Sequence, residues 1–156
     1  MSTLQNKIDF TLLITAADAN PNGDPLDGNR PRLTADGLGE ISDVCIKRKI
    51  RNRLQDMGEK IFVQSDDRCD DDCDSLRARA EKNAALKAIN KGKNTDRELF
   101  AKTACEEWID VRSFGQVFAF KNDPVSVGVR GPVTICQAKS VSTIDIVSLQ
   151  ITKSVN

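Results

Sequence analysis

The sequence predicts an α+β fold, with a four-stranded antiparallel sheet that carries helices on one face. Residues 8–14 alternate between apolar and polar side chains, which is the period of a strand with one buried face. Residues 42–58 instead carry apolar side chains at three- and four-residue steps, as an amphipathic helix does. Two later apolar runs, 129–138 and 144–151, have the composition of strands. A chain of 156 residues with 39% hydrophobic content is enough for a single domain around one core.

The first predicted strand leads into a long loop rich in asparagine, proline and glycine, which extends to Gly39. Ser42 is a suitable N-cap for the helix that follows, because its hydroxyl can accept a hydrogen bond from a backbone N–H of the first turn. The apolar stripe of this helix consists of Ile46, Ile50, Leu54 and Met57. A short apolar run at 61–63 is the fourth strand of the predicted sheet.

The middle of the chain, about 65–112, is predicted to be a helical insertion. Residues 65–74 are too rich in aspartate to form a regular element, whereas 75–91 have helical composition and stop before Gly92. The sequence 95–98 matches a capping box, which predicts a second helix over about 96–112. A ferredoxin-like sheet would need a further helix and strand after 151, so the predicted sheet is incomplete.

Composition narrows the range of functions. The 23 basic residues balance the 23 acidic ones, so any binding of nucleic acid must be local. Histidine is absent, which removes the usual general base and the usual neutral metal ligand. Five cysteines, without a signal peptide or a long apolar run, indicate reduced thiols in a cytoplasmic protein that does not enter a membrane. We therefore expect neither an enzyme of the common hydrolase kinds nor a cofactor.

Charge is strongly segregated along the chain. Residues 47–53 hold five cations and no anion, whereas 65–74 hold six aspartates and one arginine. At about 100° per residue, Lys47, Arg48 and Arg51 fall on one flank of the apolar stripe, and Lys49 and Arg53 on the other. Unpaired like charges on one helix repel, and a phosphate backbone would relieve that repulsion. A solvated face, with long basic side chains lying along apolar surface, is the alternative.

The loop that begins at Asp18 has three interpretations. Asn20 and Asn22 offer hydrogen-bonding groups to nucleic acid, but the loop also suits an ordinary surface turn. Its spacing matches the start of a calcium loop, although Asn29 stands where a bidentate glutamate is required. Neither this loop nor the Cys69–Cys73 pair has a complete set of ligands, so we expect no metal site.

Five segments, taken in order, are similar to the repeated backbone subunit of type I CRISPR surveillance complexes (Cascade). The type I-C branch is the most similar, followed by type I-B, and the resemblance runs from about residue 7 to 153. The segments are Asp18–Pro25, Gly28–Arg32, Ser42–Arg51, Asp110–Gly115 and Val129–Val133.

This resemblance implies an RRM-like (ferredoxin-like) palm with a helical insertion, of which this chain holds the N-terminal half. It also implies a non-catalytic role in antiviral defence, in a cytoplasmic ribonucleoprotein of prokaryotic or phage origin. The partners that it implies are the guide RNA, the other subunits, target DNA through the guide, and further copies along the RNA, because base pairing reads the sequence in such complexes. The residues carried over as RNA contacts are Lys47, Arg48, Lys49 and Arg51, together with Asn20, Asn22 and Arg130.

Two other functions stay open at this stage. Members of the resembled family are nearly twice as long, so a shortened homologue could act as a protein-interaction module or a decoy inhibitor of the complex. The aspartate clusters could instead belong to a metal-dependent ribonuclease, although no base lies beside them at a meaningful spacing.

Overall fold

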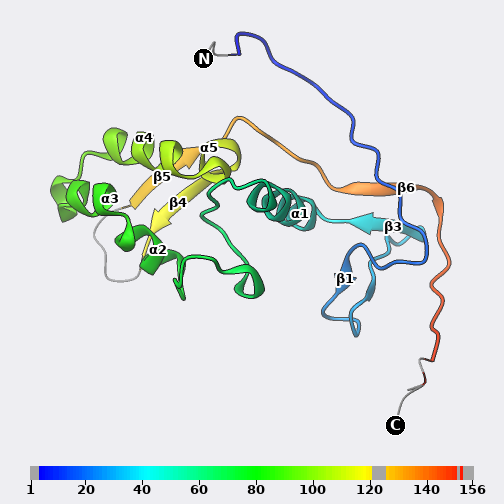
Figure 1. The fold of residues 1–156 in the computed structure, drawn as a ribbon. Helices are drawn as coiled ribbons and strands as arrows, with labels where there is room; N and C mark the ends of the chain where they lie inside the picture. Colours follow the sequence, from blue (N-terminus) through cyan, green and yellow to red (C-terminus); the bar gives the residue numbers. More distant parts are fainter. Residues whose placement is uncertain (1–3, 121–125, 151, 153–156) are drawn as a thin grey trace. The chain divides into compact units, whose positions relative to one another are not determined.

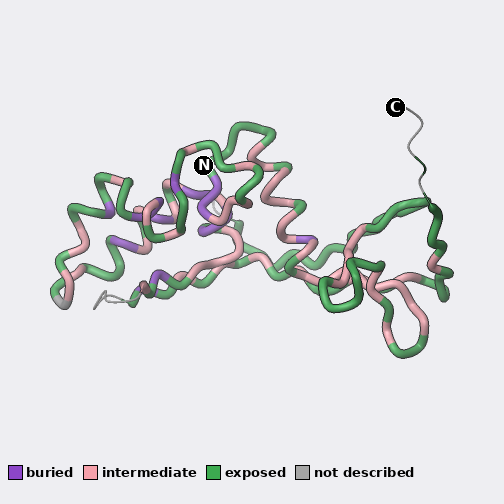
Figure 2. Tube along the Cα trace, turned by 90° about the horizontal axis from the view of Figure 1, so that it is seen from below, coloured by how far each residue is buried: buried purple, intermediate pink, exposed green. Residues whose placement is uncertain are grey.

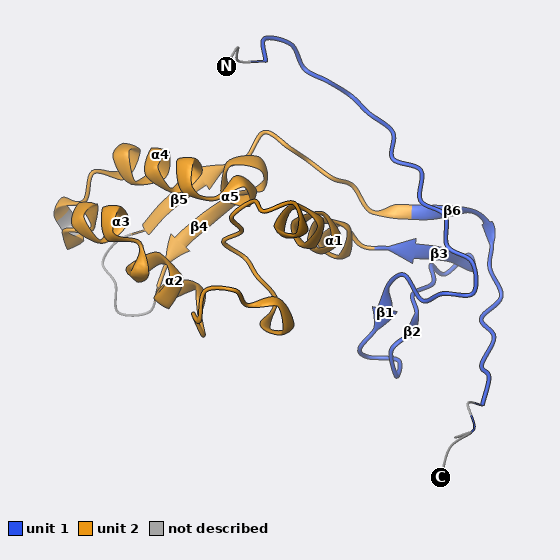
Figure 3. Cartoon of the chain, in the orientation of Figure 1, with its two compact units in different colours: residues 1–41, 139–156 blue, residues 42–138 orange. Residues whose placement is uncertain are grey.

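The computed structural model describes residues 4–120, 126–150 and 152 (Figure 1). The chain divides into two compact units (Figure 3): unit 1 comprises residues 1–41 and 139–156, and unit 2 comprises 42–138. Helices and antiparallel strands both occur, which confirms the predicted α+β class. The prediction of a single domain stays a prediction.

Unit 1 consists of short antiparallel pairs joined by loops. β1 (Gly23–Asp24) pairs with β2 (Arg30–Pro31), and β3 (Leu38–Ile41) pairs with β6 (Ala138–Thr143). The hydroxyl of Ser140 accepts a hydrogen bond from the Gly39 N–H at 2.9 Å, which ties these two strands together across 101 residues. None of the described residues of this unit is buried, and Figure 2 shows its trace in the exposed and intermediate colours.

Unit 2 contains the helices and the core. Its elements are α1 (Asp43–Asp56), η1 (Asp66–Arg68), α2 (Leu76–Lys82), α3 (Ala84–Ile89), η2 (Gly92–Asn94), α4 (Arg97–Glu107), α5 (Ile109–Phe114), β4 (Gly115–Ala119) and β5 (Ser126–Arg130). Phe62 and Phe118 lie at the centre of the core, with ring centroids 4.9 Å apart, and Trp108 packs on Phe62 at 4.7 Å. Burial of these large rings contributes to the stability of this unit.

Several predicted helix ends are confirmed and others are wrong. Ser42 caps α1 by accepting a hydrogen bond from the Cys45 N–H, as predicted. The helix predicted over 75–91 is two helices, because the side chain of Asn83 ends α2 and accepts a hydrogen bond from Leu86 N–H to begin α3. Asp96, rather than Thr95, caps α4. The helix predicted to run to 112 breaks at Trp108, whose φ and ψ of −121° and 121° are extended.

The strand predictions were less successful. Residues 8–14 form no strand, and the apolar side chains of this segment are 40% exposed or more. Residues 144–150 form no strand either, while residue 151 lies outside the described residues. The 61–63 run is not a strand either. The described strands form three two-stranded sheets rather than one sheet of four, because alternation predicts a strand but supplies no partner for it.

The run predicted as one strand over 129–138 is split. β5 ends at Arg130, and β6 begins at Ala138. Gly131 and Pro132 directly follow β5. Proline has no N–H to continue a ladder, and Gly131 lies where a Cβ would be 2.2 Å from the Ser113 carbonyl oxygen. The backbone here is therefore too close to α5 and β4 for any side chain.

This close approach predicts a strong effect of the substitution Gly131→Ala. The methyl group would collide with backbone atoms on three residues, of which Gly115 N is 2.3 Å from the ideal Cβ position. We expect a loss of about 2 kcal/mol or more in the free energy of unfolding, measured by urea titration of Trp108 fluorescence. Gly128→Ala is the matched control, since its Cβ would meet no atom within 4 Å. Equal stabilities of the two variants would show that β5 does not approach β4 in this way.

Candidate nucleic-acid interface

The cationic side chains of α1 do not all point the same way. Ile46 is buried at 4% exposure, and the arginines at 48 and 51 are partly buried against other segments of unit 2. Lys49 and Arg53, which are four residues apart, are exposed instead. The helix therefore has one cationic face that packs inward and another that faces solvent.

Arg51 forms an ion pair with a buried aspartate. Its Nε donates to Asp110 Oδ2 at 2.9 Å, and the side chains are 13% and 0% exposed. The same carboxylate accepts the backbone N–H groups of Phe62 and Val63, at 2.7 and 3.1 Å. The Arg51 guanidinium also lies over the ring of Phe114, 5.1 Å from its centroid. This arrangement satisfies a buried charge with three donors and holds three segments of the chain together.

Arg48 reaches across to the segment that follows residue 60. Its Nε donates to Asn52 Oδ1 at 2.8 Å, and its Nη1 donates to the Val63 carbonyl oxygen at 2.6 Å. Burial and the neighbouring Arg51 lower the pKa of this guanidinium from its usual value. Arg48 is thus used to attach α1 to the 60–70 segment.

The remaining cations of α1 are at the surface. Lys47 pairs with Asp43 one turn earlier at 3.1 Å, and this contact lowers the pKa of Asp43. Lys49 and Arg53 have no side-chain partner among the residues that the structure describes. They are the two side chains of the 47–53 cluster that can reach a phosphate without first giving up a contact.

The predicted contact of the 47–53 cations with phosphate requires them to face outward. This orientation is correct for Lys49 and Arg53 and wrong for Arg48 and Arg51. The physical reason is Asp110, which lies 59 residues beyond Arg51 and supplies a buried counter-charge. Sequence analysis placed Asp110 in one of the family-like segments but did not identify it as the partner of this helix. It also placed Arg53 beside Lys49 on the helix without including it among the candidate contacts.

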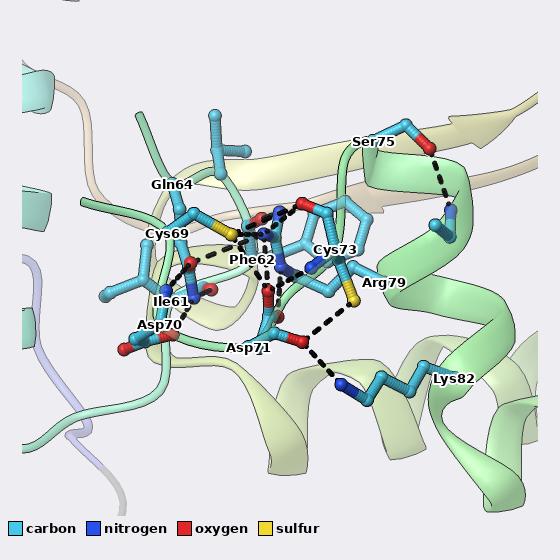
Figure 4. Close-up of polar contacts among 12 residues, drawn as sticks. Ile61, Phe62, Gln64, Cys69, Asp70, Asp71, Cys73, Ser75, Arg79 and Lys82 are labelled. Carbon is cyan, nitrogen blue, oxygen red and sulfur yellow. Dashed lines mark hydrogen bonds and ion pairs between the residues drawn. The ribbon is translucent and has the colours of Figure 1, made fainter. Parts of the chain in front are cut away.

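The aspartate-rich segment 65–74 folds around an arginine of α2 (Figure 4). Arg79, which is 6% exposed, donates to both carboxylate oxygens of Asp71 and to the Phe62 carbonyl oxygen, the latter at 2.9 Å. The hydrogen bond from Arg79 strongly lowers the pKa of Asp71, and the same contact raises the pKa of Arg79. No described carboxylate of 66–74 forms an ion pair with the cations of 47–53. The acidic segment is held by Arg79 and also by α1, whose Gln55 donates to the Arg68 carbonyl oxygen at 2.8 Å and to Asp70 Oδ2 at 2.9 Å.

The other candidate contacts lie in different surroundings. Asn20 Nδ2 donates to the Asn29 carbonyl oxygen at 2.6 Å and Asn22 Nδ2 to that of Gly23 at 3.2 Å, so both side chains stabilise the loop of unit 1. Arg130 ends β5 opposite Gly115, is exposed, and has no side-chain partner in the described part of the chain. In unit 2, Arg130 thus joins Lys49 and Arg53 as an exposed cation without a side-chain partner among the described residues.

Three of the five family-like segments meet in unit 2. They are Ser42–Arg51, Asp110–Gly115 and Val129–Val133. Arg51 bonds to Asp110, and Gly115 pairs with Arg130. The Val133 N–H donates to the Ser113 carbonyl oxygen at 2.9 Å. Part of what these segments share is therefore a structural framework around α1.

The described residues contain neither a cluster of metal-ligand side chains nor a membrane-spanning helix. No group of three or more histidine, cysteine, aspartate or glutamate side chains lies together in the described ranges in a way that could hold a metal ion. Within the same ranges, every helix is too short or too polar to cross a membrane.

Comparison with known proteins agrees with the resemblance seen in the sequence. The profile of a protein family described as CRISPR-associated protein Cas7 matches residues 6–156. A protein of Haloferax volcanii named CRISPR-associated protein Cas7 is 46% identical over 65 residues, which are 41% of this chain and 19% of the relative. The aligned part is thus a minor part of that relative. Because the family profile covers nearly the whole sequence, this chain belongs to the CRISPR-associated Cas7 family.

Proposed function

We propose that this chain is a non-catalytic subunit that binds the backbone of a guide RNA in a type I CRISPR surveillance complex in the cytoplasm. Membership of the Cas7 family supports the association with CRISPR components. The observation that carries the RNA contact is the pair of exposed, unpartnered cations Lys49 and Arg53, on a helix whose opposite face is fixed to the core. Such a surface would attract phosphates without reading bases.

The proposal divides the cationic helix into two roles. Lys49 and Arg53 contact phosphate directly. Lys47, on the other flank of the helix, is a further contact that requires it to leave Asp43, and a surface ion pair of this kind is worth less than about 1 kcal/mol. Arg48 and Arg51 position the helix through Val63 and Asp110. Arg130 is a further exposed contact, while Asn20 and Asn22 shape the loop of unit 1.

The proposed partners follow from this role. Several copies of the subunit would lie along one guide, beside the other subunits of the complex, and target DNA would be engaged through base pairing with the guide. A sequence without histidine, in which Asp110 and Asp71 are paired with arginines, supports a structural rather than a catalytic role in antiviral defence.

The double substitution Lys49→Glu with Arg53→Glu tests the direct contacts. We expect the affinity for a guide-like RNA to fall at least tenfold, because two attractive charges become repulsive, while the free energy of unfolding changes by less than about 0.5 kcal/mol at these exposed sites. Fluorescence anisotropy measures the first quantity and Trp108 fluorescence in urea the second. The control reverses Lys60 and Lys102, two exposed cations on other segments of unit 2 that form surface ion pairs with Glu107 and Glu106. An equal loss of RNA affinity in both variants would mean that net charge alone causes the effect, and it would count against an RNA site on α1.

A protein-interaction module or decoy inhibitor built on the same scaffold is the second candidate. The engagement of Arg48 and Arg51 within the chain supports it, since fewer cations remain for RNA than the sequence had suggested. Size-exclusion chromatography with the other subunits separates the two functions. Co-elution that requires RNA supports the guide-binding subunit, whereas co-elution only in its absence supports the inhibitor.

A further inference from the structure

A polar cavity in unit 2 lies where the C-terminal ends of three helices come together. Its volume is about 460 Å³, and its wall includes Gln55 of α1, Lys82 of α2 and Glu107 of α4. The indole of Trp108, which directly follows α4, also lines it. The cations proposed to contact RNA, Lys49 and Arg53, are not among the residues of this wall. The cavity is therefore a feature that the proposed function does not use.

The helix ends give the cavity a negative field. The backbone dipoles of an α-helix leave partial negative charge at its C-terminus, which favours a cation there. Two of the helices that end at the cavity are long enough for this effect, α1 with 14 residues and α4 with 11. The last turn of α4 carries Glu106 and Glu107 and no basic residue, so its side chains add to this negative charge.

The cations in the wall are already engaged within the chain. Arg79 forms an ion pair with Asp71, and the Lys82 ammonium group donates to the Asp71 carbonyl oxygen (Figure 4). Lys60 forms an ion pair with Glu107 at 2.8 Å. These contacts leave the other carboxylates of the wall without a cation from these three side chains.

Two carboxylates of the wall form no ion pair among the described residues. Asp70 accepts hydrogen bonds from neutral amide groups, Gln55 Nε2 at 2.9 Å and Gln64 Nε2 at 2.7 Å. Glu59 is exposed and has no side-chain partner in the part of the chain that the structure describes. The Oε1 atom of Gln55 is buried and receives no hydrogen bond from a described residue. The wall thus offers two negative charges and an unused acceptor.

This set of groups suits an organic cation better than a metal ion. Within the described ranges no three carboxylate, thiol or imidazole groups converge as metal ligands would. A guanidinium or ammonium group instead brings positive charge together with several N–H donors. We propose that this cavity binds a guanidinium or alkylammonium group, held by Asp70 and Glu59 at the C-terminal ends of α1 and α4. The group belongs to a free amine or to a basic side chain of a partner polypeptide, and the site is independent of the RNA contact proposed on α1.

A pair of model compounds tests the proposal on the full chain. N-acetylarginine amide carries the guanidinium, whereas N-acetylcitrulline amide has nearly the same shape and no charge. Because Trp108 lines the cavity, its fluorescence should respond to binding, and calorimetry gives the affinity independently. We expect the arginine compound to bind at least about tenfold more tightly than the citrulline compound. Equal affinities, or no binding of the arginine compound by calorimetry, would overturn the proposal.

A double variant tests the two carboxylates. Glu59→Gln with Asp70→Asn keeps the size of both side chains and removes their charge, so affinity for the arginine compound should fall at least about tenfold. The matched control, Glu98→Gln with Asp74→Asn, makes the same chemical changes at exposed positions that do not line the cavity, and it should change affinity less than about twofold. Unfolding in urea establishes that both variants are folded. An equal loss of affinity in the two variants would refute the site.

Two further titrations identify the source of the cation. Spermidine represents a free amine, and a short peptide with one arginine between neutral residues represents a partner polypeptide. Tighter binding of the peptide than of the arginine compound supports a partner polypeptide, and tighter binding of spermidine supports a free amine. The affinity for a guide-like RNA should be the same in the two double variants, so a failure of this site is distinguishable from a failure of the RNA contact.

Discussion

Replacing Asp110 with alanine is expected to destabilise unit 2 by about 3–5 kcal/mol, because it leaves Arg51 and two backbone N–H groups without their buried acceptor. Trp108, the only tryptophan of the sequence, is 5% exposed within this unit and reports its unfolding in urea. Arg51→Ala should have a similar effect, since it leaves the carboxylate unpaired. The same truncation at Arg53, which has an exposed side chain, should change the free energy of unfolding by less than about 0.5 kcal/mol.

This comparison also bears on how RNA experiments on the helix are interpreted. A charge reversal that includes Arg51 would lower RNA binding simply by unfolding the subunit, so it cannot identify a contact. If Asp110→Ala lost less than about 1 kcal/mol, the buried pair would not be the attachment of α1, and the inward role assigned to Arg51 would be wrong.

Replacing Arg79 with alanine is expected to be the second large effect, at about 3 kcal/mol. The guanidinium binds both oxygens of Asp71 and the carbonyl oxygens of Phe62 and Cys73, so its removal leaves several acceptors without a donor. Loss of these contacts should also release the 65–74 segment, which limited proteolysis would detect as faster cleavage there. Arg77→Ala is the control, because that side chain is exposed on the same helix.

The pH dependence of stability gives an independent check on this pair. The pKa of Asp71 is lower in the folded protein than in the unfolded chain, where the pKa of an aspartate is about 3.9. Its contribution to stability is therefore complete above that value and is lost as the pH falls toward the folded pKa. The unfolding free energy of the wild type should fall more steeply below about pH 4 than that of Asp71→Asn. Parallel curves would mean that the ion pair contributes little.

The helices of this protein were predictable to the extent that local chemistry decides them. Ser42 and the three- and four-residue spacing after it gave α1 nearly to the residue. Asn83 and Trp108 interrupt helices that composition alone would continue. At Asn83 a side-chain cap competes with helical propensity, and at Trp108 the backbone is extended. The segment 8–14 shows the limit for strands, since pairing depends on a partner that periodicity does not identify.

The candidate site was predictable in composition but not in orientation. The helical wheel separated Lys49 and Arg53 from the other cations, yet it could not say which flank would face the core. That choice depends on Asp110, on the carbonyl of Val63 and on the ring of Phe114, all of them remote in sequence. Long-range ion pairs of this kind are decided by tertiary packing, which is why a cluster of five cations contained only two that are free among the described residues.

The salt dependence of RNA affinity tests most directly whether the solvent-facing cations of α1 hold the guide backbone. The experiment measures the affinity of the wild type and of Lys49→Gln/Arg53→Gln for one guide-like RNA by fluorescence anisotropy. The salt concentration is varied from roughly 50 to 300 mM. The account predicts that the slope of log affinity against log salt becomes shallower by about 1.4, with unchanged stability, because two single-strand phosphate contacts are lost. An identical slope in the two proteins would contradict it.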